Sequence, residues 1–402
     1  MLNSKSRFLT NIPPKELWVK YIAVFGLYVY AIGSHSSRSL ISFGVGFVIL
    51  SWLIKLFSGG EYVNDFKRPI KYWPFIGILL FMMFSRNEFW TALGSGTFYS
   101  IIFPIALINQ IESRKMIFRV IGISSFVLTV SAVLANYQYL IENMRRAEGL
   151  ARFSITSGNV SVMGVALLLP FLFKKWDKKT INVIAGIAIF FNITAIIFSL
   201  TRGAYLALVV VLILFAVIKK PKFLPLLLIG MLLFYSFLPV NFQGRFESIF
   251  ADFTEHSRMD IWRASVDMTR DHILRGVGYD NFTEEYSNYT YENRDTRTSA
   301  HNNYLFFATE MGLFAAAIFV YLNYLLLVNF YSAYKKEQIN NKDRALYLGI
   351  FLAITGFLIA GLFETNITEA QTRNYFWALV GLGLALQTLQ LREEKDNADQ
   401  SD

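Results

Sequence analysis

The sequence predicts an all-α polytopic integral membrane protein with about 12 transmembrane helices and one large extramembrane loop that contains short helices. The first observation is composition, since 54% of the 402 residues are hydrophobic and 17% are charged. The second is that the apolar residues fall into about a dozen runs, most of them long enough to cross a bilayer. The third is that the interval 241–303 is by far the longest between runs and has the composition of a soluble segment.

In chain order, the apolar runs predict spans at 17–34, 40–57, 72–85, 90–110, 116–136, 157–173, 181–200, 204–218, 223–240, 304–331, 345–363 and 374–391. Residues 1–240 then hold the first nine helices, 241–303 the large loop, 304–391 the last three helices, and 392–402 an acidic, disordered cytoplasmic tail. The seventh and eighth runs are separated only by Thr201-Arg202-Gly203. Lysines at both 174–179 and 219–222 must share one side of the membrane, which predicts two helices there.

The basic residues divide between the two sets of alternate loops. One set holds 24 of the 38 lysines and arginines, including every lysine, so these loops and both termini are predicted to face the cytoplasm. This topology explains the net charge of +9, and no nucleic-acid partner is expected. Arginine binds phosphate as a rigid bidentate fork. The outward loops hold only arginines, which predicts a site for an anionic, phosphorylated substrate: Arg38, Arg86, Arg145, Arg146, Arg152, Arg202, Arg245, Arg258, Arg263, Arg270, Arg275, Arg294, Arg297 and Arg373.

The loop 241–303 contains seven of these arginines and eleven acids, so it is not a simple basic patch. We expect ion pairs to hold some of its arginines, with the others acting as individually placed groups. Ser257 reads as the N-cap of a helix whose apolar stripe is formed by Met259, Trp262 and Val266. Arg258 then lies in the first turn, where a cation opposes the helix dipole unless an anion binds beside it.

Three further residues have properties suited to chemistry. Arg202 lies in a turn at the outer membrane edge, where it either caps a helix C-terminus or meets a lipid-linked phosphate. His301 lies where the large loop re-enters the membrane, and it is either structural or a general base. Glu310 is the most deeply placed acid of the tenth run, and on a continuous helix it faces away from His301, which favours packing over direct catalysis.

Several signals are absent from the sequence. It has no phosphate-binding glycine loop, no His, Asp or Glu cluster at metal spacing, and no Asp-x-Asp pair. No metal or other cofactor is therefore expected, and an anionic leaving group would be stabilised by arginines.

A series of short motifs resembles the O-antigen ligase and polymerase superfamily in order, spacing and placement. The motifs are Thr201-Arg202-Gly203, Arg258-x-x-x-Trp262, Gly276-Val277-Gly278-Tyr279-Asp280-Asn281-Phe282, and His301-Asn302-x-Tyr304-Leu305 with Glu310 and Gly312. The resemblance covers roughly residues 145–315, and it departs at Ile273, where relatives often carry proline. It implies a protein of the bacterial inner (cytoplasmic) membrane that acts in lipopolysaccharide biosynthesis, with loop 241–303 and the active site on the periplasmic face.

The resemblance also implies residue roles. Arg202 and Arg258 would bind the pyrophosphate of an undecaprenyl-pyrophosphate-linked glycan, and His301 would be the base that activates the acceptor hydroxyl, steadied by Asn302. Arg152 and Arg263 are second candidates for binding the substrate, and Glu310 is a further one. The implied reaction is metal-independent and inverting, and undecaprenyl pyrophosphate departs.

Several functions share this constellation of residues. A ligase transfers the glycan to lipid A–core, whereas a polymerase transfers it to another carrier-linked unit and a protein O-oligosaccharyltransferase transfers it to protein. Chain length and the moderate single loop favour the ligase. A transporter or flippase would show broken spans in matching halves with ionisable groups near the midplane, and the clustering of the distinctive groups at one face argues against that class.

Overall fold

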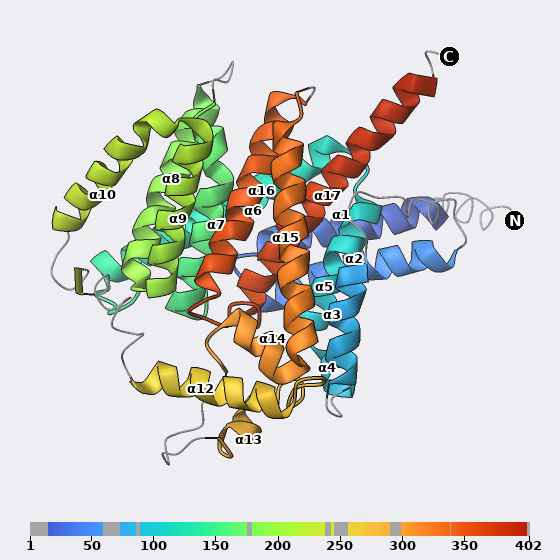
Figure 1. Ribbon diagram of the computed structural model, residues 1–402. Coiled ribbons are helices and arrows are strands. Elements are labelled where there is room, and N and C mark those ends of the chain that lie inside the picture. Colours follow the sequence, from blue (N-terminus) through green and yellow to red (C-terminus); the bar gives the residue numbers. More distant parts are fainter. Residues whose placement is uncertain are drawn as a thin grey trace, which may run out of the picture.

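The computed structural model describes residues 15–58, 73–85, 89–174, 179–237, 243–244, 256–289, 299–337 and 339–399. These residues form helices and connecting turns, and they contain no β-strand. In chain order the helices are α1 (Lys15–Gly33), α2 (Arg38–Phe57), α3 (Trp73–Phe84), α4 (Phe89–Gly94), α5 (Gly96–Gln110), α6 (Arg114–Leu140), α7 (Ser154–Leu172), α8 (Thr180–Ser199), α9 (Arg202–Lys219), the 3-10 turn η2 (Pro221–Phe223), α10 (Leu224–Phe237), α12 (His256–Asp271), α13 (Phe282–Tyr286), α14 (Asn303–Met311), α15 (Leu313–Lys335), α16 (Asn341–Ala360) and α17 (Ala370–Asp399) (Figure 1).

Within the described residues, seven helices are long and apolar enough to cross a membrane: α2, α6, α7, α8, α9, α15 and α16. This confirms a polytopic membrane protein, and each of the twelve apolar runs coincides with helical structure. The runs at 90–110 and 304–331 are not single helices. The first is divided at Ser95 into α4 and α5, and the second at Gly312 into α14 and α15. Gly312 adopts φ 94°, a conformation that glycine reaches without strain.

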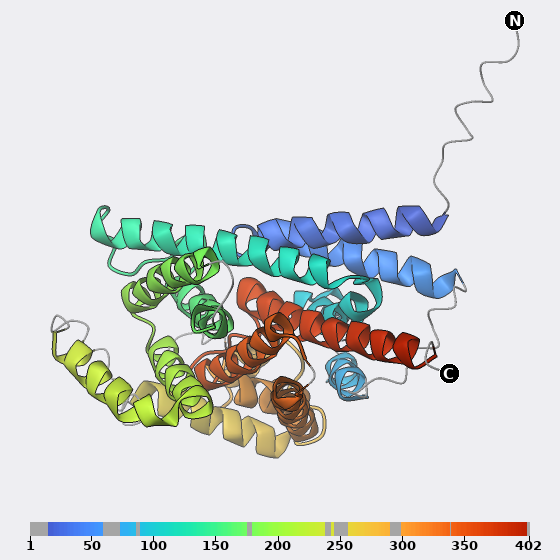
Figure 2. The ribbon, with the colours of Figure 1, turned by 90° about the horizontal axis from the view of Figure 1, so that it is seen from above.

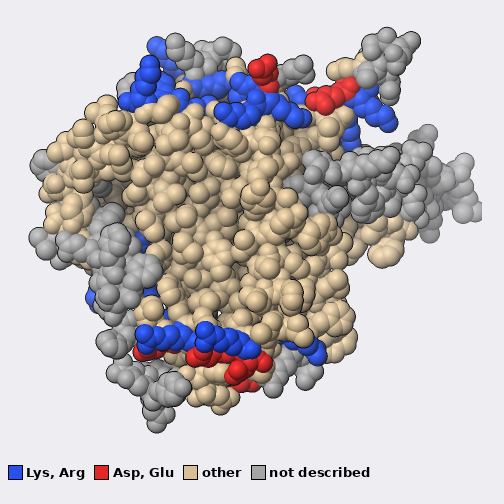
Figure 3. Space-filling view, viewed as in Figure 1, with Lys and Arg blue, Asp and Glu red and all other residues tan. Residues whose placement is uncertain are grey.

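In this view most charged side chains lie in two bands, separated over most of the surface by a broad belt of uncharged side chains, and a few basic side chains lie between the bands at the left edge (Figure 3). One band lies at the end of the bundle where α9 and α15 end, and we call it the lysine face. The last turns of these two helices carry Lys219 and Lys335. The other band lies over α12 and contains arginines beside acids, and we call that side the arginine face. The uncharged belt is the surface that a bilayer would cover.

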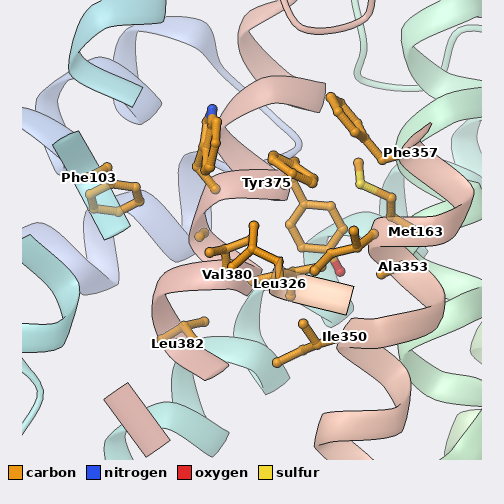
Figure 4. Close-up of a cluster of buried hydrophobic side chains, with 14 of the residues drawn as sticks. Phe103, Met163, Leu326, Ile350, Ala353, Phe357, Tyr375, Val380 and Leu382 are labelled. Carbon is orange, nitrogen blue, oxygen red and sulfur yellow. The ribbon is translucent and has the colours of Figure 1, made fainter. Parts of the chain in front are cut away.

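Helices α7 and α16 form the centre of the bundle. In their apolar windows 78% and 72% of the residues are buried, against 33% to 44% for the other five candidate spans. Gly349 lets the two helices approach, because a Cβ at this position would lie 2.6 Å from the Leu167 carbonyl oxygen. Beside this pair, apolar side chains of α5, α15 and α17 complete the core, including Phe103, Leu326 and Val380 (Figure 4).

Helices α12, α13 and α14 cover one end of the bundle, and α12 runs across the direction of α15 (Figure 1). They share a small core of their own, made of Ile261, Ala264, Met268, Val277, Phe282, Tyr286 and Ala300. Of the expected stripe of Met259, Trp262 and Val266, only Trp262 packs against this core, and Val266 is 38% exposed. The expected cap is also wrong, because α12 begins at His256 and Ser257 lies inside its first turn.

The chain after Arg392 differs from the expected disordered tail. Helix α17 continues to Asp399, and this segment projects away from the bundle (Figures 1 and 2). Four of the outward arginines, Arg86, Arg245, Arg294 and Arg297, lie outside the described residues.

Candidate active site

A single carboxylate joins two of the residues that the sequence singled out. Glu364, in the loop between α16 and α17, accepts a hydrogen bond from an Arg258 guanidinium nitrogen at 3.0 Å through Oε1. Its other oxygen, Oε2, lies 3.1 Å from His301 Nδ1. The Glu364 side chain is 11% exposed, whereas Arg258 and His301 are 19% and 33% exposed. The carboxylate is thus enclosed while both partners keep access to solvent.

The contact with Glu364 defines which nitrogen of His301 is available. A carboxylate only accepts hydrogen bonds, so Nδ1 carries the proton and donates it to Oε2. The neutral ring then has its lone pair on Nε2, the nitrogen that does not face Glu364. A histidine oriented this way can take a proton from a hydroxyl group.

Two asparagines attach the His301 loop to the loop after α16. Asn302 caps α14, because its Oδ1 accepts from the backbone N–H groups of Tyr304 and Leu305 at 2.8 and 3.1 Å. Its Nδ2 donates to the Leu362 carbonyl at 3.1 Å. Asn303 donates through its backbone N–H to the Gly361 carbonyl at 2.7 Å. His301 itself adopts φ 47°, a left-handed conformation that these contacts maintain.

Asn302 therefore positions His301 through the backbone. Its side chain is occupied by the cap and by Leu362, and the residue is 8% exposed, which leaves it little surface for a substrate.

Arg202 begins α9 beside this loop. Gly203 packs against the end of α16, because a Cβ at this position would lie 3.1 Å from Phe363 Cβ, the residue before Glu364. The arginine that bonds the end of α8 is Arg146, whose Nε donates to the Ser199 carbonyl at 2.9 Å. The structure thus places Arg202 at the N-terminus of α9, on the arginine face. The contact with a helix C-terminus that the sequence suggested for Arg202 is made by Arg146 instead.

A second group of cations lies next to the same loop. Arg38 pairs with Glu369 at 2.7 Å, and its guanidinium carbon lies 5.8 Å from the centre of the Phe153 ring. Arg152 lies 5.3 Å from the same ring. Phe153 is 43% exposed, so it presents an aromatic surface flanked by two arginines. Arg152 is thereby linked to the loop that carries Glu364.

Arg263 and Glu310 lie apart from Glu364. Arg263 is 72% exposed and its nearest acid is Asp260 at 3.8 Å on the same helix. Glu310 is 3% exposed, and its carboxylate accepts from the Asp280 backbone N–H at 2.7 Å. It lies eight positions after Asn302 on α14, which is roughly 12 Å along the axis.

Glu310 thus stabilises the turn at Gly276–Asp280 rather than facing His301. The turn is held further by the Val277 and Gly278 N–H groups, which donate to the Thr309 and Glu310 carbonyls at 2.8 and 3.1 Å. The sequence placed Glu310 deep in a long tenth membrane span, and this expectation is wrong. Glu310 lies in α14, a separate helix that is not among the candidate spans. Burial raises the pKa of Glu310 to about 8.

Glu364 is the residue that the sequence interpretation missed. It lies 63 positions after His301 and follows directly on the apolar run of α16. The available signal was the short segment Glu364-Thr-Asn-Ile-Thr-Glu369, in which two acids lie between two apolar runs. Among the described residues, no group of three or more His, Cys, Asp or Glu side chains could hold a metal ion.

A match to one protein family agrees with the motif pattern. A comparison with curated proteins finds no match. Residues 187–320 match the model of the O-antigen ligase family, and this stretch contains Arg202, Arg258 and His301 but not Glu364. Together with the seven candidate membrane spans, this match, over about a third of the chain, supports the resemblance to the O-antigen ligase and polymerase superfamily.

Proposed function

We propose that the protein is an O-antigen ligase that transfers a glycan from undecaprenyl pyrophosphate to lipid A–core at the periplasmic face of the bacterial inner membrane. The observation that carries this proposal is the Glu364 carboxylate, which contacts Arg258 and His301 at 3.0 and 3.1 Å. It joins a guanidinium group, which can bind phosphate, to an imidazole that can act as a base, and both residues lie in the stretch that matches the O-antigen ligase family.

The proposed reaction is a direct displacement at the anomeric carbon of the donor. His301 Nε2 takes the proton of the acceptor sugar hydroxyl while the hydroxyl oxygen forms the new bond to that carbon. The bond between the carbon and the pyrophosphate oxygen breaks, and its electron pair leaves with undecaprenyl pyrophosphate. Attack from the face opposite the leaving group inverts the anomeric configuration.

The charge that develops in this step lies on the departing pyrophosphate. Arg258 and Arg202 are proposed to stabilise it, because guanidinium groups bind phosphate oxygens in pairs. Glu364 neutralises part of the Arg258 charge, and it stabilises the imidazolium that forms when His301 takes the proton. Arg152 and Phe153 are proposed to contact the donor sugars, with the aromatic ring stacking on a sugar face.

The direct test of the base is His301→Ala in a membrane assay of glycan transfer. We expect transfer to be abolished while the amount of folded protein stays unchanged. His272→Ala is the matched control, because His272 lies in the turn after α12, where its backbone N–H donates to the Met268 carbonyl. Normal transfer by His301→Ala would refute the assignment of His301 as base.

The acceptor is tested by the lipopolysaccharide of a deletion strain. Loss of a ligase leaves bare core while carrier-linked polymer accumulates. Loss of a polymerase leaves core bearing a single unit, and that result would replace lipid A–core by a carrier-linked acceptor. Transfer to protein in place of either acceptor would indicate an oligosaccharyltransferase.

A further inference from the structure

A large apolar cavity opens between α7, α8, α9 and α10, on the flank of the bundle away from α1 and α2. Its volume is about 1380 Å³, and its walls include Phe173, Leu208, Leu212, Leu228 and Met231. Helix α10 leans away from the rest of the bundle, which leaves this side open toward the surrounding bilayer (Figures 1 and 2). An open apolar wall within the membrane belt is suited to hydrocarbon chains.

The charged residues of the cavity lie at one end. Lys174, Lys219, Lys220 and Arg344 line it there, together with Asn341. They come from the last residues of α7, the end of α9 and the start of α16, all on the lysine face. Among the described residues that line the cavity, none is acidic. The cavity thus combines four cations at its rim with an apolar interior.

Neighbouring contacts hold two of these cations in place. Arg344 donates to the carbonyls of Lys336 and Glu337 at 2.7 and 3.1 Å, at the end of α15. The Nε atom of Arg344 is buried and has no hydrogen-bond partner among the described residues. Lys219 Nζ lies 4.9 Å from the centre of the Tyr334 ring.

A buried acid next to Arg344 in the sequence contacts other helices. Asp343, the residue before Arg344, lies 3.4 Å from Arg114 and accepts from Asn340 and Gln390 at 2.8 and 3.0 Å. Its charge is therefore engaged with α6 and α17 and does not neutralise the rim. The charged side chains among the described lining residues are all basic, and a phosphate group complements them.

We infer that this cavity binds an anionic glycerophospholipid from the leaflet on the lysine face, with its phosphate at the rim and its acyl chains along α8, α9 and α10. A polyprenyl pyrophosphate held by Arg202 does not account for the rim. Arg202 and Lys219 begin and end α9, and 18 helical residues span roughly 27 Å. The two cationic sites therefore serve opposite leaflets, and this inference does not depend on the proposed transfer reaction.

Native mass spectrometry of the purified protein tests the inference. Phosphatidylglycerol and phosphatidylcholine with identical acyl chains are the probes, and we expect the protein to retain the first in preference to the second. The double variant Lys220→Gln/Arg344→Gln should lose about 30-fold in phosphatidylglycerol affinity, at roughly fivefold per cation. Lys335→Gln/Lys342→Gln is the control, because both lysines lie on the same face but outside the cavity lining.

A second variant tests the cavity without changing charge. Leu212→Trp adds volume to its wall and should reduce retention of phosphatidylglycerol, while circular dichroism and the melting temperature show that the fold persists. Equal retention of both lipids by the wild type would overturn the inference, as would an equal loss in the control pair. Displacement of phosphatidylglycerol by polyprenyl phosphate, unaffected by Lys220→Gln/Arg344→Gln, would also overturn it and assign the cavity to the donor lipid.

Discussion

Replacing Glu364 by glutamine should remove the base function of His301 while leaving its position unchanged. Arg258 can only donate hydrogen bonds, so the amide oxygen of the substituted side chain would turn toward it, where Oε1 of Glu364 now lies at 3.0 Å. The amide NH2 group would then face His301 Nδ1, now 3.1 Å from Oε2. An NH2 group requires an acceptor, so Nδ1 would lose its proton and Nε2 would gain one. A protonated Nε2 cannot take the proton of a hydroxyl.

The size of the effect follows from the role of the base. General base catalysis contributes about 10²- to 10⁴-fold to a rate, so Glu364→Gln should slow transfer by about that factor, or about 2.7 to 5.4 kcal/mol in the barrier. Glu364→Asp keeps the charge but is one methylene shorter and cannot reach both partners. The transfer rate of Glu364→Asp should therefore lie between those of Glu364→Gln and the wild type.

The assay is the initial rate of glycan transfer by purified protein from a polyprenyl-pyrophosphate donor, at saturating acceptor. Asp343→Asn is the matched control, because it removes a buried carboxylate at the opposite end of α16 that pairs with Arg114 at 3.4 Å. We expect Asp343→Asn to transfer at close to the wild-type rate. A folded Glu364→Gln protein that retains a third or more of the wild-type rate would refute the role of Glu364.

Three other predictions rest on the contacts described above. Arg258→Lys should slow transfer on the order of 10²-fold, because an ammonium group lacks the planar fork with which a guanidinium can bind Glu364 and a pyrophosphate oxygen side by side. Arg270→Lys, on the exposed side of α12, should leave the rate unchanged. Glu310→Gln should raise the melting temperature above that of the wild type, by an amount that grows between about pH 4.5 and pH 8 and is constant above pH 8. The reason is that the pKa of Glu310 is raised in the folded state, so the wild-type protein loses free energy of unfolding as the pH rises through that window. A difference in melting temperature that is independent of pH would contradict the burial argument. Gly276→Ala should destabilise the protein by about 1–3 kcal/mol or more, because Gly276 has φ 65° and a Cβ at this position would overlap the Glu310 carbonyl. Gly122→Ala is the control in the same melting experiment, and it should stabilise α6 slightly because the space around Gly122 is open.

The positions of the helices could be predicted well because apolar runs are a local property of the sequence. The sequence did not predict that the tenth apolar run forms two helices, α14 and α15, which are separated at Gly312. A glycine inside an apolar run usually continues the helix at a modest cost. Here the break follows from contacts distant in sequence, since the Leu313 N–H donates to the Ile273 carbonyl at 2.8 Å.

The site was predictable in part. Arg258 and His301 were identified from motifs, and the structure joins them. The joining residue, Glu364, could not be identified because its role depends on how the loop after α16 folds against Asn302 and Asn303. Ion pairs were predicted for arginines of the large loop, but the sequence did not predict that Arg258 pairs with Glu364, which lies outside that loop.

The central position of α7 and α16 has a mechanical consequence. Membranes vary in thickness, and helices that contact lipid adapt to this by tilting. The groups around Glu364 are attached to the end of α16, whose apolar window is 72% buried by protein, whereas the window of α8 is 33% buried. Adaptation to a thicker or thinner bilayer therefore falls on the peripheral helices, and the spacing between base and carboxylate stays constant as the lipid composition changes.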